Sequence, residues 1–143
     1  MRARILVLAG ILAATGVSAQ ATGTAQGDWY TQSGSAKVRI APCGSTLCGT
    51  IVWMKDPLAK GTGKPATDTN NPDPAKRQQP ILGLQMIRGM KPVGVGRWSG
   101  GTIYDPQSGK VYASKMIVNS DGTLKVEGCI SIICQGQTWK PAS

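Results

Sequence analysis

Hydrophobic and polar residues alternate in short segments along most of the chain. In residues 36–41, Val38 and Ile40 alternate with Lys37 and Arg39, and neighbouring segments are rich in Val, Ile, Thr, Tyr and Trp. A period of two residues with β-branched and aromatic side chains is typical of half-buried strands. The pattern predicts eight strands, at residues 28–31, 36–41, 47–54, 82–86, 98–104, 110–118, 124–128 and 136–140.

The segment Lys55–Pro80 breaks this pattern. It is rich in Pro, Gly and Asn, which excludes a strand or a long helix. Asp73 followed by Pro74 predicts a short helical turn at residues 74–78, because Asp caps helices and Pro suits their first position. A loop of this length in a small domain is usually functional. We therefore expect it to cover one end of the domain.

The other connections are short and contain Gly, Pro, Asn and Asp, which favours an antiparallel meander. Closing such a meander removes both exposed edges. The expected fold class is therefore all-β, an eight-stranded antiparallel barrel, with a two-sheet sandwich as the alternative. The interior of such a barrel is filled by side chains or holds one small ligand. The alternation predicts these interior residues: Val38, Ile40, Ile51, Trp53, Leu82, Leu84, Met86, Tyr112, Met116, Leu124 and Val126.

The N-terminus has the layout of a secretory signal peptide. Arg2 and Arg4 precede an apolar run at Ile5–Ala14, and small residues then lead to a cleavage site near Ala19. The run is too short to span a bilayer, although an N-terminal anchor or a buried helix is an alternative. We expect residues 1–19 to be removed and residues 20–143 to form one domain in the periplasm or outside the cell. No second apolar stretch predicts a membrane span.

Four cysteines form two Cys-x4-Cys pairs, Cys43/Cys48 and Cys129/Cys134. In an exported protein an even number of cysteines predicts disulfides. Four cysteines allow three connectivities, and we favour the two local pairs because each brackets a short turn. Zinc binding is disfavoured, because zinc sites use closer cysteine spacing or histidine and the chain has no histidine. We expect no metal and no cofactor.

The chain is basic, with 16 Lys and Arg against 7 Asp and Glu and a formal net charge of +9. Most of the excess lies between Lys55 and Arg97. Such a balance favours anionic partners, although we prefer solubility as the explanation of the excess charge. Nucleic-acid binding is disfavoured, because aromatic stacking residues do not alternate with the basic ones.

The residue types argue against an enzyme. Without histidine, the usual Ser-His-Asp, Cys-His and His-metal arrangements cannot form. The few carboxylates lie mostly in turns, so a catalytic pair is not expected. The run Asp68–Asp73 offers oxygens at alternate positions, as calcium loops do, but lacks their glycine and distal Glu. We expect its side chains to satisfy local backbone groups instead.

Several sequence blocks resemble the bacterial family called domain of unknown function 2147 (DUF 2147). These blocks extend from about Gly27 to Trp139, and they are Val38–Gly44, Leu47–Trp53, Asp68–Pro74, Leu82–Leu84, Trp98–Pro106 with Gly109–Lys110, and Gln137–Trp139. The resemblance implies an exported protein with a lipocalin-like (calycin) barrel and no established reaction. Gly27-Asp28-Trp29 also matches the Gly-x-Trp that opens lipocalin barrels. Lys140 lies where a closing basic residue would pack on Trp29.

If the barrel holds a cavity, Trp53, Met86, Tyr112 and Met116 are the expected lining residues. Arg88 follows Met86 on the same face and would lie near the mouth, where it could meet an anionic head group. A shift of one residue in register would instead place Arg88 outside the barrel.

Two functions fit this sequence. The first is an exported carrier of a small hydrophobic or amphipathic ligand, with an anionic ligand as one option. The second is a cell-envelope or host-facing interaction module with a solid barrel, in which Lys60, Lys64, Lys76 and Arg77 form a basic loop surface. The volume of the barrel interior distinguishes the two. The oligomeric state does not follow from the sequence.

Overall fold

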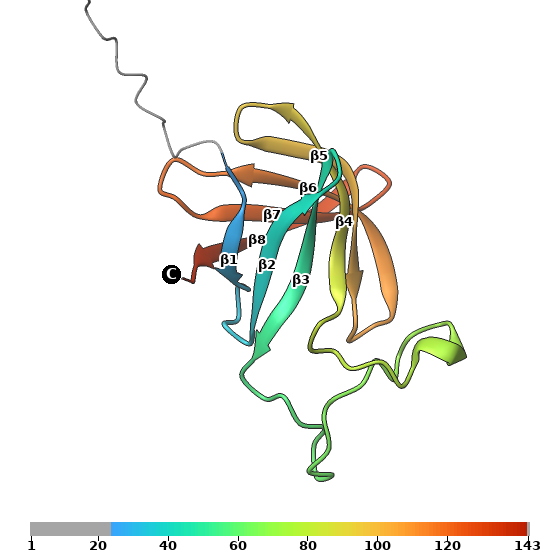
Figure 1. The fold of residues 1–143 in the computed structure, drawn as a ribbon. Coiled ribbons are helices and arrows are strands. Elements are labelled where there is room, and N and C mark those ends of the chain that lie inside the picture. The colour runs from blue at the N-terminus through green and yellow to red at the C-terminus, as the bar shows by residue number, and fades with distance from the viewer. Residues whose placement is uncertain (1–23, 143) are drawn as a thin grey trace, which may run out of the picture.

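The computed structural model describes residues 24–142, and the expected signal peptide at residues 1–19 lies outside the described residues. Eight strands follow one another along the chain (Figure 1). They are β1 (Gly27–Tyr30), β2 (Ala36–Cys43), β3 (Thr46–Met54), β4 (Gln85–Gly94), β5 (Arg97–Asp105), β6 (Lys110–Val118), β7 (Leu124–Ile130) and β8 (Ile133–Pro141). Among the described residues, no helix has the length and apolar character needed to cross a lipid bilayer.

The strands form a closed antiparallel barrel in sequence order. Each strand pairs with the next, and β1 closes the barrel by pairing with β8, where Trp29 lies opposite Pro141 and Tyr30 opposite Lys140. This closure confirms the predicted eight-stranded barrel and excludes the two-sheet sandwich. In a closed barrel every strand has two hydrogen-bonded neighbours, so no edge is left free.

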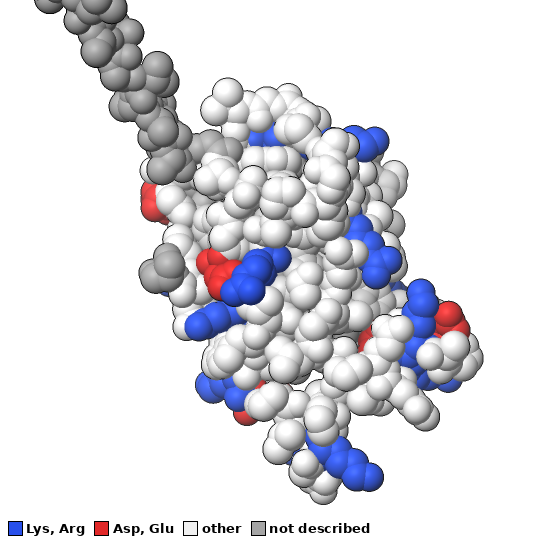
Figure 2. Space-filling view, in the orientation of Figure 1, with Lys and Arg blue, Asp and Glu red and all other residues white. Residues whose placement is uncertain are grey.

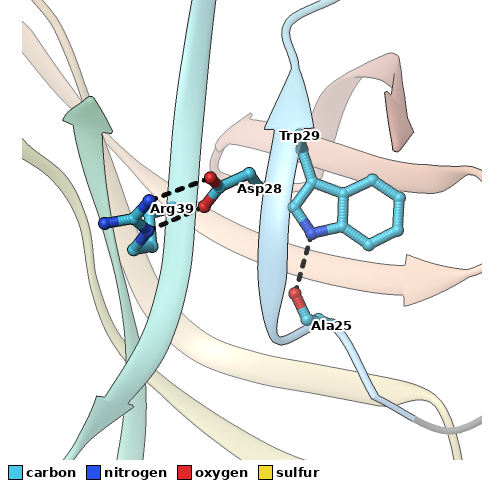
Figure 3. Close-up of polar contacts among 4 residues, drawn as sticks. All are labelled: Ala25, Asp28, Trp29 and Arg39. Carbon is cyan, nitrogen blue, oxygen red and sulfur yellow. Dashed lines mark hydrogen bonds and ion pairs between the residues drawn. The ribbon is translucent and has the colours of Figure 1, made fainter. Parts of the chain in front are cut away.

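The start of β1 is fixed on both of its faces (Figure 3). The Trp29 indole, which is buried, donates a hydrogen bond of 2.8 Å to the carbonyl oxygen of Ala25. The Asp28 carboxylate accepts hydrogen bonds of 2.8 and 3.0 Å from the Arg39 guanidinium, which lower the pKa of Asp28. The expected packing of Lys140 on Trp29 is wrong, because directly opposed residues share a face and Lys140 opposes Tyr30 instead.

The topology gives the barrel two different ends. The connections β2–β3, β4–β5 and β6–β7 lie at one end, which we call the filled end. The connections β1–β2, β3–β4, β5–β6 and β7–β8 lie at the other, which we call the open end. The β3–β4 connection, residues 55–84, is the long loop, and it extends away from the barrel in Figure 1.

The main hydrophobic core lies toward the filled end. Trp139 and Met116 are fully buried, and Ala25 closes this end from the N-terminal side. Burying large apolar side chains is the main favourable term in folding, at roughly 25 cal/mol per Å². The buried cluster consists of Ala25, Trp29, Val38, Ile40, Leu47, Ile51, Ile87, Met90, Trp98, Met116, Leu124, Val126 and Trp139.

Both disulfides are local, as expected. Cys43 bonds to Cys48 across the β2–β3 turn at the filled end, and Cys129 bonds to Cys134 across the β7–β8 turn at the open end. The described residues contain no free cysteine. Each disulfide therefore closes one hairpin, and together they stabilise one turn at each end.

The long loop contains the predicted helical turn, a 3-10 helix η2 at Pro74–Lys76. The Asp73 side chain caps it by accepting a hydrogen bond from the Ala75 N–H. Two residues expected in the barrel interior, Leu82 and Trp53, are exposed instead. Leu82 lies in the long loop and is 49% exposed, because the fourth strand begins three residues later, at Gln85.

A β-bulge explains the other misplaced interior residue, Trp53. Lys37 opposes Trp53 but Val38 opposes Ile51, so Val52 is an extra residue in β3. One extra residue moves the following side chains to the other face. Trp53 is therefore 38% exposed on the outer wall, where it packs edge-on against Tyr30 and lies beneath the Lys37 ammonium.

Candidate ligand-binding cavity

The interior of the barrel is hollow toward the open end. One cavity of about 700 Å³ lies between β5, β6, β7 and β8. A second, of about 630 Å³, lies between the β1–β2 turn, the long loop and the β5–β6 turn. Met86, Asp105 and Gln137 line both, so the two adjoin. Volumes of this size are typical of small-molecule sites.

The inward side chains become smaller or more polar from the filled end to the open end. Along β7 the inward residues are Leu124, Val126 and Gly128, and along β8 they change from Trp139 to Gln137 and Gln135. A Cβ atom at Gly128 would meet Ile103 and Tyr112 at ordinary contact distances of 3.5 Å. The cavity therefore exists because this half of the barrel has too little side-chain volume to fill it.

The lining of the first cavity contains both apolar and polar side chains. Met86, Ile103 and Val126 supply apolar surface, and Ile130 and Ile133 extend it to the rim. Gln32, Gln135 and Gln137 supply amide groups, and Gln137 lies directly beside Val126 across the β7–β8 pair. A site with these two kinds of side chain suits a molecule with an apolar body and a polar group.

Two of the glutamine side chains are held by their amide oxygens. The Trp139 indole N–H donates to Gln137 Oε1 at 3.0 Å, and the Thr138 backbone N–H donates to Gln32 Oε1 at 2.9 Å. A primary amide has one oxygen acceptor and two N–H donors. In both residues the group left for other partners is therefore chiefly the amide NH₂, a hydrogen-bond donor.

Charged groups in the lining are carboxylates. Asp105 lines both cavities and Asp56 lines the second, whereas neither cavity is lined by a described Lys or Arg. Both Asp105 oxygens accept hydrogen bonds within the β5–β6 turn, from the Gln107 N–H and the Ser108 hydroxyl. The lining therefore disfavours an anionic ligand, since nothing in it neutralises a negative charge.

The long loop is fastened to the barrel beside this cavity. Asp68 is fully buried, and its carboxylate accepts hydrogen bonds from the Tyr104 hydroxyl at 2.7 Å and from the Asn71 amide at 2.8 Å. The Asn70 amide donates to the carbonyl oxygens of Pro106 and Gln107. The run Asp68–Asp73 thus serves local and tertiary hydrogen bonds, and the loop is a fixed wall of the second cavity.

Tyr104 connects this anchor to the first cavity, which it also lines. Burial of the ring and the hydrogen bond to Asp68 raise the pKa of Tyr104 to about 12. The phenol therefore stays neutral at physiological pH, with its proton directed at Asp68. Its oxygen lone pairs can still accept a hydrogen bond.

Two of the five residues expected to bind a ligand line these cavities. Met86 lines both, and Tyr112 lines the first. Trp53 is on the outer wall, as described above, and Met116 is fully buried in the core at the filled end. Arg88 is exposed because Met86 is an extra residue in β4: Gly49 opposes Ile87, whereas Thr50 opposes Gln85. After this bulge Ile87 points inward and Arg88 outward.

The polar lining was not expected from the sequence. Sequence alternation could have identified Gln137, because counting back from Trp139 in β8 places Gln137 and Gln135 on the same face. It could not have identified the contact between Tyr104 and Asp68, because these residues come together from segments 36 residues apart. One described cluster, Glu127, Cys129 and Cys134, has potential metal-ligating atoms within 4.8 Å, but the two sulfurs are bonded to each other.

Comparison with known proteins agrees with this architecture. The model of the family described as "Uncharacterized protein conserved in bacteria (DUF2147)" matches residues 27–141. The chain belongs to the DUF2147 family. The match spans all eight strands and confirms the resemblance found in the sequence. No curated protein sequence matches this DUF2147 chain.

A solved structure shares the fold. This DUF2147 member is similar to protein HP1028 from the human pathogen Helicobacter pylori, which is described as belonging to the lipocalin family. The two share 22% sequence identity over 85% of each chain, with a TM-score of 0.74. At this identity the likeness shows a lipocalin-like barrel and says nothing of the ligand.

Proposed function

We propose that this chain is an exported carrier that holds a small, uncharged amphipathic molecule in the cavity at the open end of its barrel. The observation that carries the proposal is the mixed lining, in which the apolar side chains of Met86, Ile103 and Val126 occur together with the amides of Gln32 and Gln137. The fixed amide NH₂ groups would receive the polar group of the ligand. Its apolar body would lie against the aliphatic side chains.

Several features support export and a non-enzymatic role. Both hairpin disulfides are typical of oxidising compartments, and the N-terminal sequence is typical of a signal peptide cleaved near Ala19. The periplasm or the medium is therefore the proposed location. The chain has no histidine, and Asp105 in the cavity wall is engaged in a turn. The interaction module is not favoured, because it requires a solid barrel.

The test is to extract and identify what the protein carries. The chain from Gln20 onward contains the whole barrel and its core, so it is the form to test. After expression with export to the periplasm, native mass spectrometry should show an uncharged amphipathic molecule bound with a stoichiometry near one. Organic extraction then identifies it. The proposal would be contradicted if the protein were purified without a bound molecule and then bound no member of a panel of monoglycerides, fatty amides and fatty alcohols.

A variant that fills the cavity localises the binding. Gly128→Leu should abolish binding, because Gly128 lines the cavity and its Cβ direction is free of hard collisions. Ala113→Leu is the matched control: Ala113 is exposed on the adjacent strand β6, where the same bulk points away from the interior. Equal loss of binding in both variants, with both still folded, would place the ligand elsewhere.

A further inference from the structure

Exposed apolar side chains gather at the open end of the barrel. Nine large hydrophobic residues among those described are well exposed, and six belong to segments at this end. The six are Leu58, Leu82, Val111, Ile130, Ile132 and Ile133. Of the other three, Trp53 lies on the outer wall, and Val93 and Val95 lie on the β4–β5 hairpin at the filled end. Uneven exposure of this kind marks an interaction surface.

The tip of the β7–β8 hairpin is the most prominent part of this surface. Ile130, Ile132 and Ile133 are 66%, 94% and 72% exposed. The disulfide Cys129–Cys134 crosses the hairpin directly behind them. A tip constrained in this way cannot easily fold back to bury its side chains, so the isoleucines project into solvent unless something covers them.

The same end carries exposed positive charge. Six Lys and Arg residues of the long loop and the start of β6 are exposed, and none of them forms an ion pair within the described part of the chain; they are Lys55, Lys60, Lys64, Lys76, Arg77 and Lys110. Lys37, near the start of β2, is partly buried against Tyr30 and Trp53. Only Asp56 and Asp73 are exposed acidic residues here, since Asp68 is buried and Asp105 is partly buried. Figure 2 shows Lys and Arg side chains on the long loop at the bottom and lower right of the view.

We infer that the open end docks on the surface of an anionic lipid bilayer. The isoleucine tip enters the interface between head groups and acyl chains, and the Lys and Arg side chains of the long loop, at the same end of the barrel, contact the lipid phosphates. The mouth of the cavity then faces the membrane, where an amphipathic molecule could enter or leave. Docking goes beyond the carrier function and does not require the cavity to be occupied.

The arrangement favours a lipid surface over a second copy of the chain. The apolar side chains lie on three separate segments, the long loop, the start of β6 and the β7–β8 hairpin, and the first two also carry Lys residues. A surface divided in this way suits a fluid bilayer better than a partner of fixed shape. A symmetric dimer through this end would place two sets of six positive charges against each other. Juxtaposed like charges are costly across an interface.

Vesicle co-sedimentation tests the inference with the chain from Gln20 onward, which lacks the apolar N-terminal run. We expect binding to vesicles of phosphatidylethanolamine and phosphatidylglycerol, and much weaker binding to vesicles of phosphatidylcholine alone. The double variant Lys60→Gln/Lys64→Gln should weaken binding to the anionic vesicles about thirtyfold, since each of the two basic residues near such a surface contributes about 1 kcal/mol. High salt should weaken it as well.

The hairpin tip provides a matched pair of variants. Ile132→Ser should lower the partition coefficient about threefold or more, because it removes apolar surface from the docking tip. Val95→Ser is the control, since Val95 is 93% exposed on a hairpin at the filled end, and it should bind as the unmodified chain does. Absence of binding to anionic vesicles, or equal loss in both variants, would overturn the inference. So would a concentration-dependent dimer in light scattering that Ile132→Ser dissolves.

Discussion

The two ends of this barrel are built from the same eight strands, but the interior is packed with side chains at one end and hollow at the other. At the filled end, Trp139, Met116 and Leu124 are fully buried, and the connections are short turns. At the open end, the inward positions of the same strands carry Gly128, Gln137 and Tyr112, and a loop of thirty residues, 55–84, joins β3 to β4. The filled end stabilises the fold, and the open end provides the cavity.

The difference shows that side-chain volume, rather than strand number, decides whether an eight-stranded barrel is solid. Inward residues of β7 and β8 lose volume or apolar character within three alternate positions, and the cavity begins where they do. Because the core at the filled end already holds the barrel together, residues at the open end are free to serve binding. Substitutions at the two ends should therefore have unequal effects on stability.

The largest expected effect is at the filled end. Met116→Ala removes a fully buried side chain from close packing, and such substitutions cost about 2–5 kcal/mol. Tyr112→Ala is the matched variant, because Tyr112 lies on the same face of β6 but lines the cavity. It should cost about 1 kcal/mol, because its ring already borders open space.

Urea unfolding followed by tryptophan fluorescence measures both free energies of unfolding. The unmodified chain, stripped of any ligand, is the reference for each variant. If Tyr112→Ala were as destabilising as Met116→Ala, the open half would be packed as tightly as the filled half. The distinction between the two ends would then fail.

The next effect concerns how the long loop is fastened at the open end. Gly109, in the β5–β6 turn, has φ +71, and a Cβ there would collide with the Asn70 carbonyl oxygen. Gly122, in the β6–β7 turn at the filled end, has φ +84 but no atom within 4 Å of its Cβ position. Gly122→Ala should cost about 1 kcal/mol from backbone strain alone. Gly109→Ala should cost about 1–3 kcal/mol more, because it also displaces the loop.

Limited trypsin digestion separates the two contributions. Lys60, Lys76 and Arg77 are exposed cleavage sites in the loop, and none of them is followed by proline. Gly109→Ala should accelerate cleavage at these sites, whereas Gly122→Ala should leave the rate unchanged. Equal rates in the two glycine variants would mean that the loop does not depend on its contact with the β5–β6 turn.

The sequence predicted the elements of the barrel better than the faces of its strands. Alternation located seven of the eight strands, and spacing located both disulfides, because each depends on residues near one another in the chain. The fourth strand was expected at residues 82–86, whereas β4 covers Gln85–Gly94, so the two share only Gln85 and Met86. The two bulges, at Val52 and Met86, reversed the predicted faces of Trp53 and Arg88. Neither bulge contains a Gly or Pro that would indicate it in the sequence. A strict period of two therefore assigned the residues beyond each bulge to the wrong face of the strand.

The cavity could be predicted only in part, for a different reason. Met86 and Tyr112 followed from alternation, whereas the anchor between Asp68 and Tyr104 depends on how the long loop returns to the barrel. That path is set by tertiary hydrogen bonds, including those from Asn70 to the β5–β6 turn. No local pattern in one sequence contains this information.

The smallest expected effect tests that anchor through its pH dependence. The pKa of Tyr104 is raised from 10.0 to about 12, so the folded chain holds this proton more strongly than the unfolded chain does. The resulting stability is fully present below pH 10 and declines as the pH rises toward about 12. Tyr104→Phe removes the donor to the buried Asp68 and should cost about 1 kcal/mol at neutral pH. The difference from the unmodified chain should shrink over that alkaline range.

Two measurements on the same proteins check this. Phenolate absorbance should show one tyrosine titrating near pH 12, and this late transition should vanish in Tyr104→Phe but persist in Tyr112→Phe. Urea unfolding between neutral pH and pH 12 should show the free energies of unfolding of the unmodified chain and Tyr104→Phe converging. A gap that stays constant across this range would mean that Tyr104 does not hold its proton through Asp68. The loop would then be fastened chiefly by Asn70, at the turn rather than inside the open end.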